Sequence, residues 1–333
     1  MVSLPKSWVK RVGLSRGSHV YLEEMPDGSL LVSAERSAEE TRGMVKVVDA
    51  RGLNLDEIIR EVVSAYRAGY DSIVVFYGES ELELPKRLIE ECKERLADLM
   101  VVAEKPSMIV FSIASSSRPD QLSRLMTLMV KNILEMTEDL VENAKKENVE
   151  KLKEIYKRDS VVDKIYFMVA KILSKTLSGE ASLAEAGLKS YAEVLHFYHA
   201  VKTLERISDH ICSASCALVK LYSHGEKLAN DALLLMEDTA RAERDMLNAL
   251  LKLDVRQAKS VASLSENIKK KLEKYLIEES NTDKHSVLLD LHRITSYLLD
   301  IAEIVIDVNS VREFVQLKTK YLAEMSKIGA ESR

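Results

Sequence analysis

Residues 151–173 read KLKEIYKRDSVVDKIYFMVAKIL, and their apolar side chains recur at alternating steps of three and four. This spacing is typical of an amphipathic helix, in which one stripe of side chains faces a core. The members of the stripe are Leu152, Ile155, Asp159, Val162, Tyr166, Val169 and Leu173. The stretch therefore predicts a long helix in a helical bundle, with one carboxylate, that of Asp159, on its core-facing side.

The chain after Pro119 contains few residues that interrupt helices. All five prolines lie at or before Pro119, and only four of the eleven glycines lie after Gly78. Proline and glycine both disfavour the interior of a helix. We therefore expect long helices near residues 120–146, 148–175, 185–223, 226–252, 254–279 and 284–322.

These expected helices form two similar sets of three. The segment that begins at Asn148 aligns with the one that begins at Asp254, and Leu204-Glu-Arg-Ile-Ser aligns with Leu291-His-Arg-Ile-Thr. A repeat of this length folds most simply as two three-helix bundles in tandem. The predicted bundles span residues 119–224 and 225–323.

The first part of the chain has shorter apolar runs, separated by turn residues. Residues 1–35 predict a small β module, with strands at residues 2–5, 19–23 and 29–33 and a turn at Pro26-Asp-Gly28. Residues 44–113 alternate between the two periodicities and predict a small α+β domain. Its expected strands are Met44–Val48, Ser72–Tyr77 and two runs around Val101 and Ile109, and its expected helices are Leu55–Arg67 and Leu84–Leu96. The predicted fold class is mainly α with an α+β N-terminal part.

Composition restricts the classes of protein that fit. The 333 residues include 48 Lys and Arg against 53 Asp and Glu, so any nucleic-acid binding needs a local basic patch. No run approaches the ~18 apolar residues of a membrane-spanning helix, and no secretory leader is recognisable. Three cysteines are too few for a disulfide framework. These features together predict a cytoplasmic protein with no transmembrane segment.

Two pairs of acids share one spacing. Asp163 follows Asp159 by one helical turn, and Glu205 and Asp209 repeat the spacing in the third helix of the same set. Like charges four residues apart repel each other unless a cation lies between them. Four carboxylates suit magnesium, manganese or iron and also accept zinc. We therefore expect a metal site at these four residues, with solvated helix faces as the alternative.

Cys212 and Cys216 continue the stripe of Glu205 and Asp209, which leaves a mixed carboxylate and thiolate site open beside ordinary core filling. The second set of helices keeps the apolar stripe but has none of the four acids. Its equivalent positions hold Ser265, Lys269, His292 and Ser296. A metal site is therefore expected in the first bundle alone.

Asp159-Ser-Val-Val-Asp163 and Glu205-Arg-Ile-Ser-Asp209-His210 resemble the helix motifs of the PhoU family of phosphate-uptake regulators. The resemblance covers about residues 120–322. It implies tandem three-helix bundles that bind multinuclear metal clusters, and partners that are the phosphate ABC transporter or its signalling kinase. The replaced acids of the second set depart from the family's pattern for a second cluster.

Residues 2–20, VSLPKSWVKRVGLSRGSHV, resemble the AbrB-type swapped-hairpin module, which binds DNA as a homodimer. Lys6, Lys10, Arg11 and Arg16 stand in residues 1–22 without any acid. Four cations per chain could contact the phosphate backbone, and dimerisation without DNA binding is the alternative. The combination of this module, an α+β linker domain and a PhoU repeat resembles PhoU-like regulators of archaea.

These features favour a metal-binding regulator of phosphate uptake that also binds DNA and is not an enzyme. The first alternative is a carboxylate-bridged di-metal enzyme, since helical bundles with paired acids can carry such sites. Against it, the sequence has no Glu-x-x-His ligand pair, no phosphate-cradling glycine loop and no dinucleotide fingerprint. The second alternative is a structural dimer whose metal motifs have degenerated.

Overall fold

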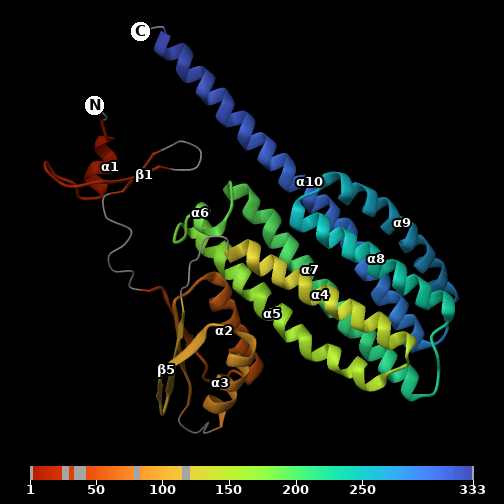
Figure 1. Cartoon of the computed structure of the whole chain (residues 1–333). Coiled ribbons are helices and arrows are strands. Elements are labelled where there is room, and N and C mark those ends of the chain that lie inside the picture. Colours follow the sequence, from red (N-terminus) through yellow and green to blue (C-terminus); the bar gives the residue numbers. More distant parts are fainter. Residues whose placement is uncertain (1–2, 25–29, 34–42, 79–82, 115–120, 332–333) are drawn as a thin grey trace. The chain divides into compact units, whose positions relative to one another are not determined.

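The computed structural model describes residues 3–24, 30–33, 43–78, 83–114 and 121–331 (Figure 1). The chain divides into two compact units, residues 45–313 and residues 1–44 with residues 314–333. The described residues are mainly helical, with strands only in the N-terminal third, which confirms the predicted fold class. None of the described helices is at once long and apolar enough to cross a membrane.

The N-terminal segment contains a short helix and a hairpin. Helix α1 spans Lys6–Arg11, and strand β1 (Tyr21–Glu24) pairs antiparallel with β2 (Leu30–Ser33). The expected strand at residues 2–5 is wrong over its described part, because residues 3–5 form no strand and a helix follows them. Pro5 caps this helix and its carbonyl accepts from Val9 N, at 3.0 Å. The sequence favoured a strand because apolar and polar side chains alternate at Val2, Ser3 and Leu4. The predicted turn at residues 26–28 lies outside the described residues.

The α+β domain is a four-stranded sheet with two helices on one face. In chain order its elements are β3 (Val45–Asp49), α2 (Leu55–Ala68), β4 (Ser72–Phe76), α3 (Leu84–Arg95), β5 (Leu99–Lys105) and β6 (Met108–Ile113). The strand order is β3-β4-β6-β5, in which only β3 and β4 are parallel. Ile73, Val75 and Phe111 are fully buried under the helices. β3, α2, β4 and α3 lie within one residue of their predicted bounds, and β5 and β6 contain Val101 and Ile109 as expected.

The helical region contains seven helices within its described residues. They are α4 (Gln121–Lys145), α5 (Val149–Ser178), α6 (Leu183–Ala186), α7 (Tyr191–Ser223), α8 (Asn230–Lys252), α9 (Val255–Glu278) and α10 (Thr282–Glu331). The prediction placed the start of α7 six residues too early, because it merged α7 with the short α6. Gly187 ends α6 with a left-handed φ of 73°. The prediction also began α8 four residues early and ended α10 at residue 322.

The structure repeats at equivalent turns 106 residues apart. Glu147 and Leu253 have left-handed φ angles of 53° and 52°, although neither is glycine. The next residues, Asn148 and Asp254, each cap the following helix. The Asn148 side chain accepts a hydrogen bond from Lys151 N, and the Asp254 side chain accepts one from Gln257 N. A shared backbone strain at the same place supports the repeat that the sequence indicated.

Equivalent positions of the two bundles also contact each other. Thr137 Oγ1 donates to Glu243 Oε1 at 2.7 Å, and Arg244 Nη2 lies 2.8 Å from Glu138 Oε1. Each pair joins residues 106 positions apart, one on α4 and one on α8. The two bundles therefore meet around a local two-fold axis between these helices.

Helices α7 and α10 are joined by a ladder of acid–base contacts. From one end to the other, the pairs are Glu193–Arg312, His196–Asp307, His210–Asp290 and His224–Asp283. The numbers rise along α7 while they fall along α10, so the helices run antiparallel. These contacts hold the first bundle to the second over the length of α7.

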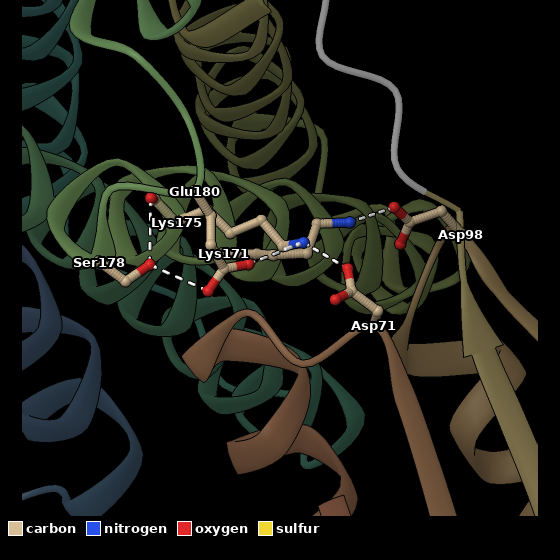
Figure 2. A network of polar contacts seen from close by, with 6 residues as sticks. All are labelled: Asp71, Asp98, Lys171, Lys175, Ser178 and Glu180. Atoms are coloured by element: carbon tan, nitrogen blue, oxygen red, sulfur yellow. Dashed lines mark hydrogen bonds and ion pairs between the residues drawn. The ribbon is translucent and has the colours of Figure 1, made fainter. Parts of the chain in front are cut away.

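The α+β domain docks on α5 through partly buried charges (Figure 2). Lys171 forms an ion pair with Asp98, which also accepts a hydrogen bond from the hydroxyl of Tyr66. One turn further along α5, Lys175 Nζ lies 2.5 Å from Asp71 Oδ1. Gly69 ends α2 with a φ of 96°, and a Cβ there would come within 2.9 Å of the Lys175 side chain. The close approach and the left-handed backbone both require glycine at this position.

Candidate metal centre

The four predicted acids lie on the two helices that contact each other most closely in the first bundle. Asp159 and Asp163 belong to α5, and Glu205 and Asp209 belong to α7. The six apolar members of the α5 stripe are all buried, as the sequence predicted. The acids lie at the edge of this core and are half-buried. The structure thus brings all four carboxylates to one interface.

Two of the acids have partners on α7. The hydroxyl of Ser208 donates to Asp159 Oδ1 at 2.6 Å. Lys202 Nζ lies 2.6 and 2.7 Å from the two carboxylate oxygens of Glu205, and 4.9 Å from the ring centre of Tyr166. Lys202 therefore neutralises Glu205 directly.

The other two acids, Asp163 and Asp209, have neither a hydrogen bond nor an ion pair with any described residue. Burial raises the pKa of Asp163 to about 7, and the charges of Asp159, Glu205 and Asp209 add to the rise. Burial also raises the pKa of Asp209 to about 6, with further contributions from Glu205 and Asp159. The site therefore holds more negative charge than Lys202 balances.

The pKa of Asp159 is raised as well. Burial raises its pKa, the hydrogen bond from Ser208 opposes the rise, and the charge of Glu205 adds to it. The donor set is then four carboxylates and one hydroxyl, which is the oxygen chemistry that magnesium, manganese and iron prefer. In its chemistry, the site fits a hard divalent cation.

The side chains do not yet surround a common ion position. Over the described residues, no three Asp, Glu, His or Cys side chains are grouped so that they could hold one metal ion. Ligation by all four acids requires side-chain rotations and the release of Glu205 by Lys202.

The cysteines and His210 are placed less favourably for a ligand role. Cys212 is buried, and burial together with the charge of Asp159 raises the pKa of its thiol, so it stays protonated at neutral pH. Cys216 is exposed. His210 turns toward α10, where its Nδ1 lies 2.8 Å from Asp290 Oδ1. These observations favour core filling for Cys212 and a structural contact for His210.

The equivalent site of the second bundle lacks a carboxylate cluster. Ser265 is fully buried, and its hydroxyl has no hydrogen-bond partner. Ser296 donates to the carbonyl of His292 in its own helix, at 2.9 Å. His292 Nε2 lies 3.4 Å from Glu273 Oε1, which comes from α9. The substituted positions thus serve helix packing.

The four predicted DNA-binding cations lie on or just after α1. Lys6, Lys10 and Arg11 are helical, Arg16 follows in a turn, and all four are exposed. Lys6 and Lys10 are one turn apart and so share a face of the helix. The helix itself buries none of its residues.

Sequence reasoning missed Lys202, Ser208 and Arg206, which make direct contacts to the acids; Arg206 Nε lies 3.8 Å from Glu205 Oε2. Lys202 precedes Glu205 by three residues, a spacing that brings opposite charges together on a helix surface. That signal could have identified the lysine. Ser208 offered no comparable pattern.

Two parts of the chain match known protein families. Residues 126–217 match the family model described as PhoU domain, and residues 1–40 match the model described as "Antidote-toxin recognition MazE, bacterial antitoxin". No curated protein matches the chain. Similar solved structures include PhoU from Pseudomonas aeruginosa (16% identity, TM-score 0.48, 57% of this chain and 96% of that one). They also include the phosphate transport system regulatory protein PhoU from Streptococcus pneumoniae (15% identity, TM-score 0.43, 57% and 93%). All four acids accordingly lie in a segment that matches the PhoU domain.

Proposed function

We propose that the chain is a metal-binding regulator of phosphate uptake that acts by binding partners. The observation that carries the metal-binding part is the cluster of four half-buried carboxylates on α5 and α7, two of which lack a partner among the described residues. The PhoU match over residues 126–217 supports the link to phosphate. The proposed partners are a phosphate ABC transporter or a phosphate-signalling kinase, met in the cytoplasm.

Asp159, Asp163, Glu205 and Asp209 would hold the metal, with magnesium, manganese, iron or zinc as candidates. The bound cation would supply the positive charge that the cluster lacks. Ser208 orients the Asp159 carboxylate through its hydrogen bond. Lys202 neutralises Glu205 and lowers the pKa of both Asp163 and Asp209. Ser208 therefore influences the orientation of the carboxylates around the proposed metal site, and Lys202 influences the net charge of that site.

The first test is elemental analysis of the purified chain and of an Asp159→Asn, Asp209→Asn double variant. We expect roughly one or more ions per chain in the wild type and a loss of most of that metal in the variant, because two charged ligands are removed at nearly constant volume. Circular dichroism at matched concentration checks that both proteins keep their helices.

A matched control is the Glu150→Gln, Glu154→Gln variant, which removes two charges from the exposed face of the same helix. Both glutamates pair only with neighbouring lysines on that face. This variant should keep its metal. Equal metal content in the wild type and both variants would refute the site, and an absence of metal from all three would favour a structural dimer.

We further infer that the N-terminal segment binds DNA as a homodimer. In one copy the hairpin leaves apolar side chains in contact with solvent: Tyr21 is 42% exposed, Leu22 63% and Leu30 61%. A segment this small cannot bury them alone, so a second copy is the natural cover. The match of residues 1–40 to an antitoxin model supports a compact N-terminal module.

DNA binding is tested with the quadruple variant Lys6→Ala, Lys10→Ala, Arg11→Ala, Arg16→Ala on a mixed-sequence duplex. We expect the variant to bind DNA more weakly. The slope of log affinity against log salt concentration should also become less steep, by up to about 7 if all eight cations of a dimer contact phosphates. Fluorescence anisotropy at several salt concentrations measures both quantities. The control removes Lys269, Lys270, Lys271 and Lys274 from α9 and should bind normally. Unchanged binding by the N-terminal variant would contradict the proposal.

A further inference from the structure

The sheet of the α+β domain has one covered face and one apolar face that stays exposed. Successive side chains of a strand point to opposite faces. Those on one face pack under α2 and α3, which lie on the side toward α5 (Figure 1). The apolar side chains of the other face keep large exposed fractions: Val45 52%, Val47 57%, Phe76 40%, Met100 52% and Val102 58%.

The exposed apolar residues belong to β3, β4 and β5, and the sheet face that contains them spans all four strands. Strands about 4.8 Å apart with five residues of about 3.3 Å each give a face of roughly 300 Å² in projection. This is about the size of the largest apolar patch on a typical monomer, which is often functional. The area is below what holds two free proteins together, but it suits a contact between chains that are already joined elsewhere.

The end of the sheet carries opposite charges on its two edge strands. Asp49 on β3 is in register with Phe76, Phe76 with Met108, and Met108 with Lys105 on β5. These four residues form one row across the sheet, with an anion at one edge and a cation at the other. Consider two copies whose sheets face each other across a two-fold axis that runs parallel to the strands. The second copy then has its strands in the reverse order, and its row lies directly opposite the row of the first copy. Asp49 of each copy therefore faces Lys105 of the other, which gives two such pairs.

The same operation places Phe76 opposite Met108 of the second copy, a favourable aromatic–thioether contact. The charges and the row are thus self-complementary, as a two-fold interface requires. Asp49 already binds Arg51, with Arg51 Nε 2.8 Å from Asp49 Oδ1, and its carboxylate is exposed. It keeps lone pairs for a second cation.

We propose that this face packs against the same face of a second copy of the chain, with the two-fold axis parallel to the strands. The inference rests on the proposed N-terminal dimer, which supplies the second copy. Residues 34–44 connect β2 to β3 and span at most about 40 Å, so the hairpin dimer keeps both sheets in one particle.

Cysteines introduced at the two ends of the neighbouring row test the arrangement and leave Asp49 and Lys105 in place. In this row Val47 is in register with Val74, Val74 with Val110, and Val110 with Ala103. The full chain carries Val47→Cys and Ala103→Cys, with the exposed Cys216 changed to Ser. Within one chain the two positions are three strand spacings apart, about 14 Å, whereas facing positions of packed sheets are only about 10 Å apart at the backbone. A bismaleimide with a reach below about 10 Å should therefore link position 47 of one chain to position 103 of another.

Equal amounts of ¹⁵N-labelled and unlabelled protein are mixed and reassociated before linking, and linked peptides are identified by mass spectrometry. We expect most of the protein at about twice 37.5 kDa, with links between labelled and unlabelled peptides. Each single-cysteine variant is a control and should not link, because equal edges lie on opposite sides of the axis. A Phe76→Asp change on the inner strand β4 should abolish the link while the helix content stays constant.

Sedimentation of the unlinked wild type separates the two proposals. A dimer that gives no 47–103 link would overturn the sheet contact and leave the hairpin dimer standing. A monomer would overturn both. Links within a single isotope only, after complete exchange of chains, would show that another part of the same chain covers the face and would also overturn the contact.

Discussion

Replacement of Glu243 by Gln is expected to stabilise the protein by about 1 kcal/mol at pH 5 and on the order of 4–5 kcal/mol at pH 9. Glu243 is fully buried in α8. Its Oε1 accepts a hydrogen bond from Thr137, and its Oε2 has no partner. Burial raises its pKa to about 8 from an ordinary value of 4.5, against opposing effects of Thr137 and Arg244.

The sign follows from the difference between the folded and unfolded states. Below about pH 4.5 the carboxyl is protonated in both states and has no effect on the pH dependence. Between 4.5 and 8 the unfolded state releases its proton while the folded state keeps it, so stability falls as the pH rises. Above 8 the loss is complete. Gln cannot ionise, so the variant escapes this loss.

Urea unfolding at pH 5 and pH 9 measures the effect, with Asp245→Asn as control. Asp245 is exposed on the same helix and should show no such change. The difference in the free energy of unfolding between the wild type and Glu243→Gln should increase steadily between these pH values. Parallel stability curves for the two proteins would show that Glu243 is not buried as described.

The change Arg312→Met is expected to lower the free energy of unfolding by about 3–5 kcal/mol. The Glu193 side chain has no exposed surface, and Arg312 Nε and Nη2 lie 3.0 and 3.3 Å from its two oxygens. The backbone N–H of Lys189 also donates to Glu193, with Lys189 N at 3.4 Å from Glu193 Oε2. Loss of the guanidinium therefore leaves a charge in the interior with little compensation.

Urea unfolding of three proteins checks this expectation. Arg293→Met on the exposed side of the same helix should be nearly neutral. The double variant Glu193→Leu, Arg312→Met should recover most of the stability, because it removes both charges and fills the space with apolar atoms. A single Arg312→Met variant as stable as the wild type would exclude a structural role for the pair.

Periodicity allowed the fold class and most helices to be predicted from the sequence. The stripe around Asp159 and the repeat at Asn148 and Asp254 both depend on local spacing, which the sequence carries directly. Glu243 was also within reach, since it continues the apolar face of α8 beside Ala242 and Met246, and both of these are buried. The short helix α1 was not, because its six residues are too few to show a helical period.

Contacts between distant segments could not be predicted in this way. Lys171 and Lys175 have the spacing of an ordinary solvated helix face, and only the docked domain shows that their partners are Asp98 and Asp71. The same holds for the pairing of His210 with Asp290. Local propensity contains no information about which of many charges will be neighbours after folding.

The local two-fold axis between the bundles bears on the origin of the protein. Thr137 faces its own counterpart in the repeat, Glu243, and Glu138 faces its counterpart, Arg244. Positions related by symmetry meet in this way when two identical subunits associate. The tandem arrangement is what gene duplication and fusion of an ancestral homodimer would leave behind. After the fusion the halves were free to diverge, so one could keep the acids while the other replaced them with Ser265, Lys269, His292 and Ser296.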